Sequence, residues 1–433
     1  MSLRRFWRLV GKLQMLQQSE DTSVKTQSAA PAASEKKMRV LLLCSHPTQY
    51  SSPMWRRMSQ HPQLEALVAY CSLEGAEAHV DPGFGVEVAW DVPLLDGYTW
   101  VKLKNSSPRP AVGPFFGLIN PGVWKLIRTE RFDAIAVFTG YMCVTFWIAL
   151  IAAKISGIPL LYGTDATTLR PLDGRSWKAR VKKHLWPWLF QMADVVIAPS
   201  SGTVALMRSL NIPEERIQLA PYVVDNDWWK QKAKLVDRAA VRQSWGVPVD
   251  ANVILFCAKL QPWKRPRDLL RAFSRVDIFN SYLVYAGDGA MREQLEREAT
   301  ELHVQDRVRF LGFVNQSALP QVYCSSDLMV LPSEYEAFGV VVNEAMLCGC
   351  PVIVSDQVGA RFDLVKENET GFVYPAGDVE ALRGALCRAF ECRDRLRRMG
   401  EAACARMSEW SPEMNMEATV EAIKKAIQYK KRT

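Results

Sequence analysis

The stretch LPSEYEAFGVVVNEAMLCGCPVIVSD, residues 331–356, contains the pattern that decides the fold. An apolar strand ends at Pro332, a polar loop follows it, and a segment with helical spacing runs from about Gly339 to Cys348. Gly349 ends that helix, and CPVIVSD continues as a second apolar strand. Strands that are apolar on both faces belong to parallel sheets covered by helices, so this stretch predicts one strand–helix–strand unit of an α/β fold.

The same alternation extends over the chain from Met38. Apolar runs predict two successive series of strands, one starting at MRVLLLCS (38–45) and one at NVILFCA (252–258), with helical patterns between them. Two such series predict two doubly wound, Rossmann-like α/β domains. We expect these domains over residues 38–222 and 223–410, followed by a helix and tail over 411–433 with Ser411 as the N-cap.

Composition narrows the class of protein. The 433 residues are 48% hydrophobic and 23% charged, which excludes a wholly disordered chain. The formal net charge of +8 is modest for this length, so it fits anionic substrates or a membrane surface and does not argue for nucleic acid. The longest apolar stretch, residues 141–153, is too short to span a bilayer, and we expect a buried crossover helix there.

Two features bear on location. The ten cysteines are scattered without the paired spacing of a zinc site, which favours reduced thiols in a cytoplasmic protein. Residues 1–37 combine a basic amphipathic segment with a linker rich in Ala, Ser and Thr. This extension is either a dispensable tail or a helix that lies on an anionic membrane, such as the inner face of the plasma membrane.

The loop and helix of residues 331–356 suit a phosphorylated ligand. Gly339 lacks a Cβ, so a phosphate can approach the main chain where the helix presents unpaired N–H groups. Glu344 can accept two hydrogen bonds from a ribose diol, and Glu336 can accept bonds from hydroxyls of a sugar beyond the phosphates. The alternative is that both glutamates are ordinary surface charges beside a core helix.

A basic loop lies about seventy residues upstream. In FCAKLQPWKRPRDLLRAF, Lys259 and Lys264 flank the turn between a strand and a helix. Cations at the end of a buried strand can neutralise a diphosphate leaving group. The following YAGDGAMREQLE places Gly287 in a turn that opens a helix, which by itself is a weak phosphate signal.

Together these motifs resemble the retaining glycosyltransferases of family 4, which have the GT-B fold of two Rossmann-like domains facing across a cleft. The family signature is Glu-x-Phe-Gly-x4-Glu-Ala followed by Gly-x-Pro-Val, and its counterparts here are Glu336, Phe338, Gly339, Glu344, Ala345, Gly349, Pro351 and Val352. The resemblance implies that Glu336 contacts the donor sugar, that Glu344 contacts the nucleotide ribose, and that Lys259 and Lys264 form the diphosphate clamp. Lys259 stands where the family usually has Arg.

Other residues are assigned through the same resemblance. Phe338, Val340 and Gly287 join Gly339 and Glu344 as expected donor-binding residues. Asp165 stands where many members have a histidine that contacts the donor sugar, so we count it with the catalytic group.

The N-terminal half resembles a bacterial subset with a His-Pro-x-Gln-Tyr motif. His46, Gln49 and Tyr50 are then expected to face the cleft, and Arg170 is a further candidate for positioning sugar or acceptor. In the 81–100 stretch, Asp91 and Asp96 are expected on an acceptor-side loop. The remaining His61, His79, His184 and His303 show no partner pattern and are expected at the surface.

The resulting hypothesis is an enzyme that moves a hexose from a UDP- or GDP-sugar to a hydroxyl acceptor with retained configuration. The acceptor class implied by the family is a glycan or lipid-linked glycan of cell-envelope or exopolysaccharide synthesis. We expect no metal and no cofactor, because the basic clamp can replace a metal in stabilising the leaving diphosphate. A GT-B sugar-nucleotide epimerase and a non-catalytic nucleotide-sugar-binding scaffold remain as alternatives.

Overall fold

The structure is a computed structural model that describes residues 37–81, 83–170 and 176–432. The amphipathic segment and linker expected in the N-terminal extension lie outside the described residues. Among the helices that are described, none is both long and apolar enough to cross a bilayer.

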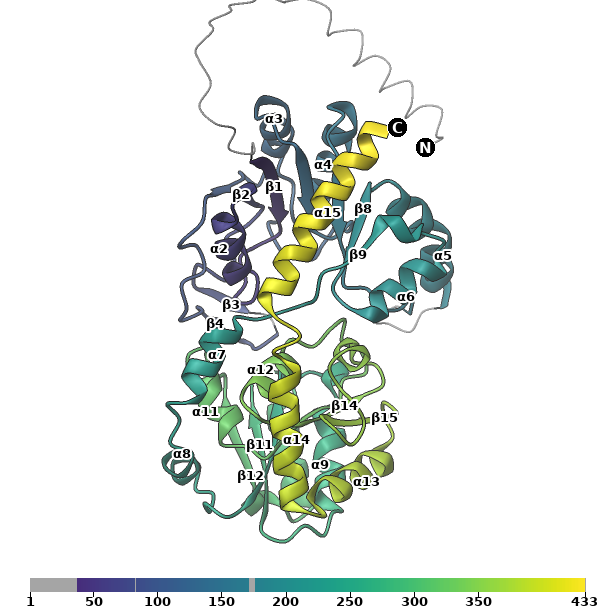
Figure 1. The fold of residues 1–433 in the computed structure, drawn as a ribbon. Helices are drawn as coiled ribbons and strands as arrows, with labels where there is room; N and C mark the ends of the chain where they lie inside the picture. The colour runs from purple at the N-terminus through teal and green to yellow at the C-terminus, as the bar shows by residue number, and fades with distance from the viewer. Residues whose placement is uncertain (1–36, 82, 171–175, 433) are drawn as a thin grey trace, which may run out of the picture. The chain divides into compact units, whose positions relative to one another are not determined.

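The N-terminal lobe is built on a seven-stranded sheet in which all neighbouring strands are parallel (Figure 1). Its central strands are apolar and buried on both faces because helices cover both sides of the sheet. In spatial order they are β5 (Trp100–Lys102), β2 (Leu64–Tyr70), β1 (Met38–Cys44), β6 (Ala134–Val137), β7 (Leu160–Gly163), β8 (Val195–Ala198) and β9 (Ile217–Leu219).

The helices of this lobe connect the parallel strands. The apolar run near residue 150 forms the crossover helix α4 between β6 and β7, as its position between two strands predicts. The helices are α2 (Ser52–Gln60), α3 (Gly122–Thr129), α4 (Val144–Ile155), α5 (Ser176–Gln191) and α6 (Ser201–Ser209), with a short 3-10 turn η1 (Glu214–Arg216). The helices α7 (Asn226–Ala233) and α8 (Arg238–Ser244) follow and lead into the second lobe.

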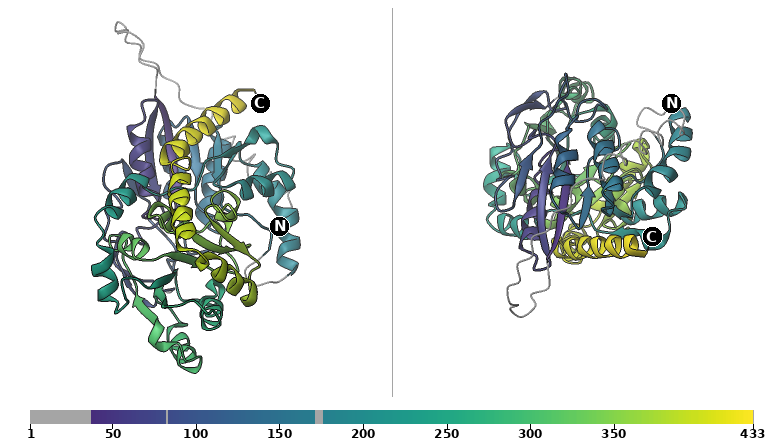
Figure 2. Two further views of the ribbon diagram at one scale, coloured as in Figure 1. Left: turned by 60° about the horizontal axis from the view of Figure 1, so that its bottom comes forward. Right: turned by 90° about the horizontal axis from the view of Figure 1, so that it is seen from above.

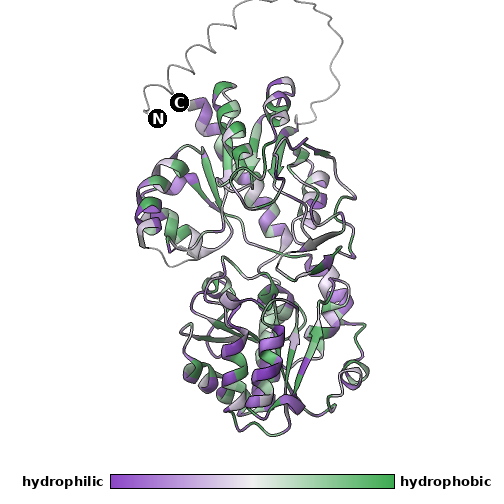
Figure 3. Cartoon of the chain, turned by 180° about the vertical axis from the view of Figure 1, so that it is seen from behind, coloured by the Kyte–Doolittle hydropathy of each residue, from purple (hydrophilic) through white to green (hydrophobic). Residues whose placement is uncertain are grey.

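The C-terminal lobe repeats the architecture with a six-stranded parallel sheet. In spatial order its strands are β12 (Val308–Gly312), β11 (Ser281–Ala286), β10 (Asn252–Cys257), β13 (Leu328–Leu331), β14 (Val352–Ser355) and β15 (Gly371–Tyr374). Its helices are α9 (Pro266–Ser274), α10 (Arg292–Glu301), α11 (Leu319–Cys324), α12 (Val341–Leu347), α13 (Val379–Phe390) and α14 (Arg393–Arg406), with 3-10 turns η2 (Pro262–Lys264), η3 (Gln305–Arg307) and η4 (Gly359–Phe362). Figure 3 shows the strands largely in green, whereas the helices carry green and purple residues side by side.

The last helix returns to the first lobe. α15 (Pro412–Arg432) follows α14 in the chain but packs against β6 to β9 and α2 (Figure 2). Ser411 caps it, since its hydroxyl accepts a hydrogen bond from the Met414 N–H at 3.3 Å. The two doubly wound lobes and the C-terminal helix confirm the fold class expected from the sequence.

One part of the first lobe differs from expectation. The 81–100 stretch, where a loop was expected, overlaps the antiparallel hairpin β3 (His79–Asp81) and β4 (Val86–Val88) and the start of the edge strand β5. Each of these strands has three residues, so none shows the apolar run that reveals the central strands. The hairpin is important because it carries a carboxylate to the other lobe.

Candidate functional site

A cavity of about 410 Å³ lies at the carboxyl ends of the C-terminal strands, and we call it the charged cavity. The loops after β10, β11 and β13 supply most of its wall, as expected for ligand sites of open parallel sheets. Eight residues of the C-terminal lobe assigned to donor binding or catalysis from the sequence line it: Lys259, Lys264, Gly287, Glu336, Phe338, Gly339, Val340 and Glu344. The fold therefore gathers residues that are up to 85 positions apart in the chain, from Lys259 to Glu344.

Glu336 and Lys264 form an ion pair inside this cavity. The Lys264 ammonium donates to Glu336 Oε2, and both side chains are about four-fifths buried, with 18% and 19% exposure. Backbone bonds to the next strand-end loop hold Glu336, whose N–H donates to the Gln357 carbonyl at 3.2 Å. The pair thus presents a fixed carboxylate and a fixed cation at one point on the wall.

Lys259 is paired across the lobes. Its ammonium donates to Asp81 Oδ1 and Oδ2 at 2.7 and 2.8 Å, and it lies 4.7 Å from the centre of the Phe84 ring. Burial opposes ionisation of Asp81, but bonds from Lys259 and from the Phe84 and Gly83 N–H groups outweigh it, so the pKa of Asp81 is lowered. Asp81 therefore remains a carboxylate at neutral pH.

The acidic residues of the 81–100 stretch are engaged by other groups of the protein. Asp91 lines neither cavity described here, and its carboxylate accepts hydrogen bonds from the Ser317 N–H and hydroxyl in the C-terminal lobe. The carbonyl of Asp96 accepts a bond from Arg56 at 2.9 Å within its own lobe. Asp81 and Asp91 therefore connect this stretch to the C-terminal lobe.

Glu344 lies at the back of the charged cavity with 4% exposure. Burial raises its pKa to about 7, although hydrogen bonds from Tyr323 and Gln316 lower it in part. The Tyr323 hydroxyl donates to Glu344 Oε2 at 2.8 Å, which fixes the orientation of the carboxyl group. Glu344 therefore changes its charge near neutral pH.

Two glycines meet the steric demands of the cavity floor. Gly339 has φ = +95°, and a Cβ there would lie 3.1 Å from the Glu336 side chain. Gly287 has φ = +146°, and a Cβ there would lie 2.0 Å from the Ala258 carbonyl oxygen. Both positions require glycine because L-residues strongly disfavour these conformations and the space is already occupied.

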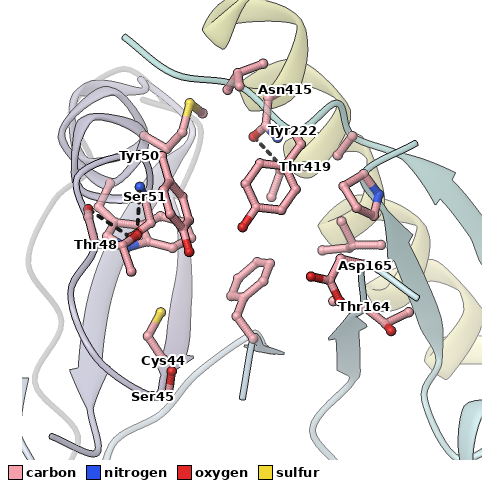
Figure 4. A pocket seen from close by; sticks show the side chains of 18 of the residues that line it. Cys44, Ser45, Thr48, Tyr50, Ser51, Thr164, Asp165, Tyr222, Asn415 and Thr419 are labelled. Atoms are coloured by element: carbon pink, nitrogen blue, oxygen red, sulfur yellow. Dashed lines mark hydrogen bonds between the residues drawn. The ribbon is translucent and has the colours of Figure 1, made fainter. Parts of the chain in front are cut away.

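A second cavity of about 290 Å³ lies at the strand ends of the N-terminal lobe, and we call it the aromatic cavity. Figure 4 shows Thr48, Tyr50 and Ser51 on one side and Thr164 and Asp165 on the other. His46 also lines it, with Nδ1 2.9 Å from the Ser45 hydroxyl. No lysine or arginine occurs among its lining residues within the described part of the chain.

The two cavities share the residues Tyr50, Asp165 and Tyr222. The Tyr222 ring stacks on Phe338 with centroids 5.1 Å apart and contacts Tyr50 at 5.4 Å. Asp165 is exposed to this shared space, and its pKa is raised by loss of contact with bulk water and by the charge of Glu336. Tyr50, Asp165 and Tyr222 thus mark the place where the two cavities meet.

Of the remaining residues singled out in the sequence, some lie where they were expected and others do not. Gln49 lines the charged cavity. Arg170 lines neither cavity; its side chain is 60% exposed and lies 3.7 Å from Glu334. His61 was expected at the surface, but it is 7% exposed and lies 3.7 Å from Glu417, because α15 packs over it. His184 and His303 are exposed as expected, and the side chain of His79 lies outside the described set.

Several lining residues could not be assigned from the sequence. Asn415 and Thr419 reach the aromatic cavity from α15, which no local pattern links to the N-terminal lobe. Phe84, Trp90 and Phe313 line the charged cavity from two lobes, and Phe84 packs edge-to-face on Phe313 at 4.9 Å. The one available signal was the place of Phe313 just after an apolar strand.

Comparisons with known proteins agree with this geometry. Residues 29–222 match the model of the glycosyl transferase 4-like domain, and residues 237–406 match that of glycosyl transferases group 1. An uncharacterized glycosyltransferase of Methanocaldococcus jannaschii is 35% identical over 310 residues, covering 67% of this chain and 76% of the relative. The N-acetyl-α-D-glucosaminyl L-malate synthase of Bacillus anthracis is 27% identical, covering 60% of this chain and 65% of the relative.

Solved structures share the fold. Anabaena HepE, solved in complex with UDP and glucose, superposes with a TM-score of 0.66 at 22% identity, covering 89% of this chain and 98% of HepE. The fold, the two family models and the Methanocaldococcus jannaschii relative together identify a GT-B glycosyltransferase. The chain belongs to the group 1, family 4-like glycosyltransferases.

Proposed function

We propose that the protein transfers a hexose from a UDP- or GDP-sugar to a hydroxyl group of an uncharged sugar acceptor, with retention of configuration. The acceptor would be a glycan or lipid-linked glycan of cell-envelope or exopolysaccharide synthesis, and transfer would occur in the cytoplasm. The observation that carries this proposal is the gathering of Lys259, Lys264, Glu336 and Glu344 in the charged cavity.

The charged cavity offers one partner for each part of a nucleotide sugar. The ammonium groups of Lys259 and Lys264 suit the diphosphate, because charge-assisted hydrogen bonds to phosphate are strong. The Glu344 carboxylate suits the ribose diol, and Glu336 suits the hydroxyls of the sugar. The presence of UDP and glucose in the HepE structure supports this class of donor.

We propose a transfer step that uses this placement. The bond between the anomeric carbon and the diphosphate oxygen breaks, and Lys259 and Lys264 stabilise the negative charge that develops on the leaving diphosphate. The acceptor oxygen forms its bond to the anomeric carbon from the same face, and its proton passes to the departing phosphate oxygen. We assign no metal to this step, since two cations of the chain already face the leaving group.

The aromatic cavity suits an uncharged acceptor. No lysine or arginine is present among its described lining residues, and its shared wall carries the Asp165 carboxyl group, which would repel an anion. The buried indole N–H of Trp55, which lines this cavity, has no hydrogen-bond partner among the described residues and could donate to a sugar hydroxyl. The malate of the Bacillus anthracis relative's product is a dicarboxylic acid, so we expect a different acceptor class here.

The second cavity also favours transfer over epimerisation. A sugar-nucleotide epimerase needs no second substrate, whereas a transferase needs an acceptor site beside the donor sugar. The aromatic cavity meets the charged cavity at Asp165, where an acceptor hydroxyl would approach the sugar. This arrangement supports a two-substrate reaction.

The test combines donor binding with turnover. Calorimetry with UDP- and GDP-sugars identifies the donor, and transfer to neutral sugar glycosides is then followed by NMR, which also reports the anomeric configuration. We expect Glu336→Gln to lower kcat about 100-fold or more while the melting temperature stays near that of the wild type. Glu334→Gln, on the same loop but outside the cavity lining, is the matched control and should retain activity. Equal activity of both variants, or an inverted product, would disprove the proposal.

A further inference from the structure

The helix α5 exposes an apolar face to solvent. Trp177, Val181, Leu185 and Trp188 are 53%, 50%, 36% and 47% exposed. Their spacing of four, four and three residues places them on one side of the helix. The opposite side is also apolar, with Trp186, Leu189 and Phe190 buried in the lobe. One apolar side of α5 is therefore buried in its own lobe, and the second apolar side is left exposed to solvent.

The exposed face continues onto neighbouring elements. Trp188 stacks on Trp147 of α4 with centroids 6.3 Å apart. The amino end of α4 in turn contacts the 115–116 segment, because the Val144 N–H donates to the Phe115 carbonyl at 3.1 Å. Phe115 and Phe116 are 37% and 67% exposed. We call this surface the aromatic face: Trp177, Val181, Leu185 and Trp188 of α5 with Phe115 and Phe116.

Basic residues border the aromatic face. α5 contains four of them and no aspartate or glutamate: Lys178, Arg180, Lys182 and Lys183. The helical positions of Lys178 and Arg180 fall on opposite sides of the apolar stripe. Residues 103–129, which include Phe115 and Phe116, also contain no acidic residue. The two segments that form the aromatic face, α5 and residues 103–129, therefore contribute only positive formal charge.

We propose that the aromatic face docks on the surface of an anionic lipid bilayer, with α5 lying in the interface. Tryptophan and phenylalanine side chains enter the boundary between headgroups and acyl chains, while lysine and arginine remain beside the lipid phosphates. Each basic side chain near an anionic membrane adds to the affinity, which fits the border of the face.

Charge argues against the other occupants available within this chain. Residues 1–36 contain six basic and three acidic residues, so they are positively charged and would be repelled by the border of the aromatic face. A second copy of the chain would bring a face with the same positive border. A negatively charged bilayer complements the face in both charge and polarity.

The position of α5 links the membrane to the aromatic cavity. The Trp186 indole N–H of α5 donates to the Tyr141 hydroxyl at 3.1 Å. The Tyr141 backbone N–H donates at 3.3 Å to the hydroxyl of Tyr162, which lines the cavity. Two successive hydrogen bonds thus link α5 to the wall of the proposed acceptor site. A docked α5 would bring that site close to the bilayer surface, although binding itself does not depend on the proposed activity.

Vesicle co-sedimentation of the full chain tests the proposal. We expect binding to phosphatidylcholine vesicles that contain phosphatidylglycerol and much weaker binding to phosphatidylcholine alone. Arg180→Gln with Lys183→Gln should lower the partition coefficient about 30-fold, since each basic residue near the surface contributes about a factor of five. Trp177→Ser with Phe116→Ser should also weaken binding, because both exposed rings would leave the interface.

Matched variants in the other lobe serve as controls. Arg297→Gln with Arg397→Gln removes two charges that are 69% and 68% exposed, and Phe279→Ser removes a ring that is 87% exposed. Both control proteins should bind like the wild type, and thermal melts confirm that every variant is folded. Equal binding of the α5 and control variants would overturn the proposal and assign any binding to residues 1–36. Loss of a dimer in the α5 variants, without vesicle binding by the wild type, would instead identify a contact between copies.

Discussion

Asp81 holds the ammonium group that we assign to the donor diphosphate. Its carboxylate lies 2.7 and 2.8 Å from Lys259 Nζ, so an incoming diphosphate competes with it for the same cation. In Asp81→Asn the charge is lost, while the side-chain oxygen can still accept the bonds from the Gly83 and Phe84 N–H groups. We expect the Kd of the nucleotide sugar to fall about two- to fivefold in calorimetry, the range for a partly exposed ion pair.

The hairpin supplies its own control for this prediction. Glu87 is exposed on β4, so Glu87→Gln removes the same charge from the same element without touching Lys259. Its Kd should equal that of the wild type. Weaker binding by Asp81→Asn would show instead that the carboxylate positions Lys259 for the donor.

Glu344 makes donor binding depend on pH. Its raised pKa of about 7 means that it is largely protonated at pH 6 and largely ionised at pH 8. Only the ionised form leaves all its lone pairs for a ribose diol, so affinity should increase as the pH rises through 7. A nucleotide sugar suits the measurement because its diphosphate, esterified at both ends, does not titrate in this range. Glu344→Gln should give a flat profile with weaker binding, and a flat wild-type profile would contradict the ribose assignment.

The same group affects stability in the opposite direction. Because its pKa rises from 4.5 to about 7 on folding, the folded protein holds a proton that the unfolded chain releases in this window. The contribution of Glu344 to stability is therefore full below pH 4.5 and declines as the pH rises to 7. Glu344→Gln should have its largest gain in melting temperature over the wild type at pH 8 and a smaller one at pH 5.

At the scale of elements, the turn between β11 and α10 depends on Gly287. A Cβ there would lie 2.0 Å from the Ala258 carbonyl oxygen, and the φ of +146° is strained for any other residue. Gly287→Ala should reduce the free energy of unfolding by about 3 kcal/mol or more in urea titrations. Gly384→Ala in α13, where the nearest atom of another residue lies 3.8 Å from the added Cβ, should instead gain about 0.5–1 kcal/mol. A loss in both variants would mean that the helix also has no room for a methyl group.

Elements with a strong local signal were predictable and those without one were not. The central strands are apolar on both faces, so runs such as MRVLLLC and NVILFC can be predicted as strands from the local sequence alone. The strands β3 and β4 have three residues each, and the sequence between them contains proline and glycine. The pairing of the two strands therefore depends on the lobe against which the hairpin docks. Its role in holding Lys259 could not be inferred for the same reason.

The site shows the same division. Residues of the charged cavity were found because a short contiguous motif, from Glu336 to Glu344, carries the ligand chemistry at fixed spacing. The partners that complete the site come from distant segments: Asp81 from the other lobe, and Asn415 and Thr419 from α15. The destination of α15 is set by which apolar surface it covers, and helical periodicity does not specify that surface.

At the scale of the whole molecule, the charges of the three surfaces fit one substrate arrangement. The charged cavity holds two lysines for the donor diphosphate, the aromatic cavity has no lysine or arginine in its described lining, and the border of α5 is basic again. A lipid-linked glycan would match this order, since its phosphate stays at the membrane surface near α5 while its uncharged sugar reaches the aromatic cavity. An acceptor would then bind well with an anionic group far from its reacting hydroxyl, and it would bind poorly with an anionic group beside that hydroxyl.

This arrangement predicts the charge preference of the acceptor. A neutral sugar glycoside should be glycosylated, and the same sugar with a phosphate on the reacting ring should show a kcat/KM at least about tenfold lower, because desolvating an unpaired charge costs at least about 1.4 kcal/mol. Placing the phosphate at the end of a long alkyl aglycone should restore the rate. The rates come from competition between the acceptors at a fixed donor concentration, with Glu336→Gln as the background. A preference for the ring phosphate would mean that a cation reaches the aromatic cavity when substrate binds.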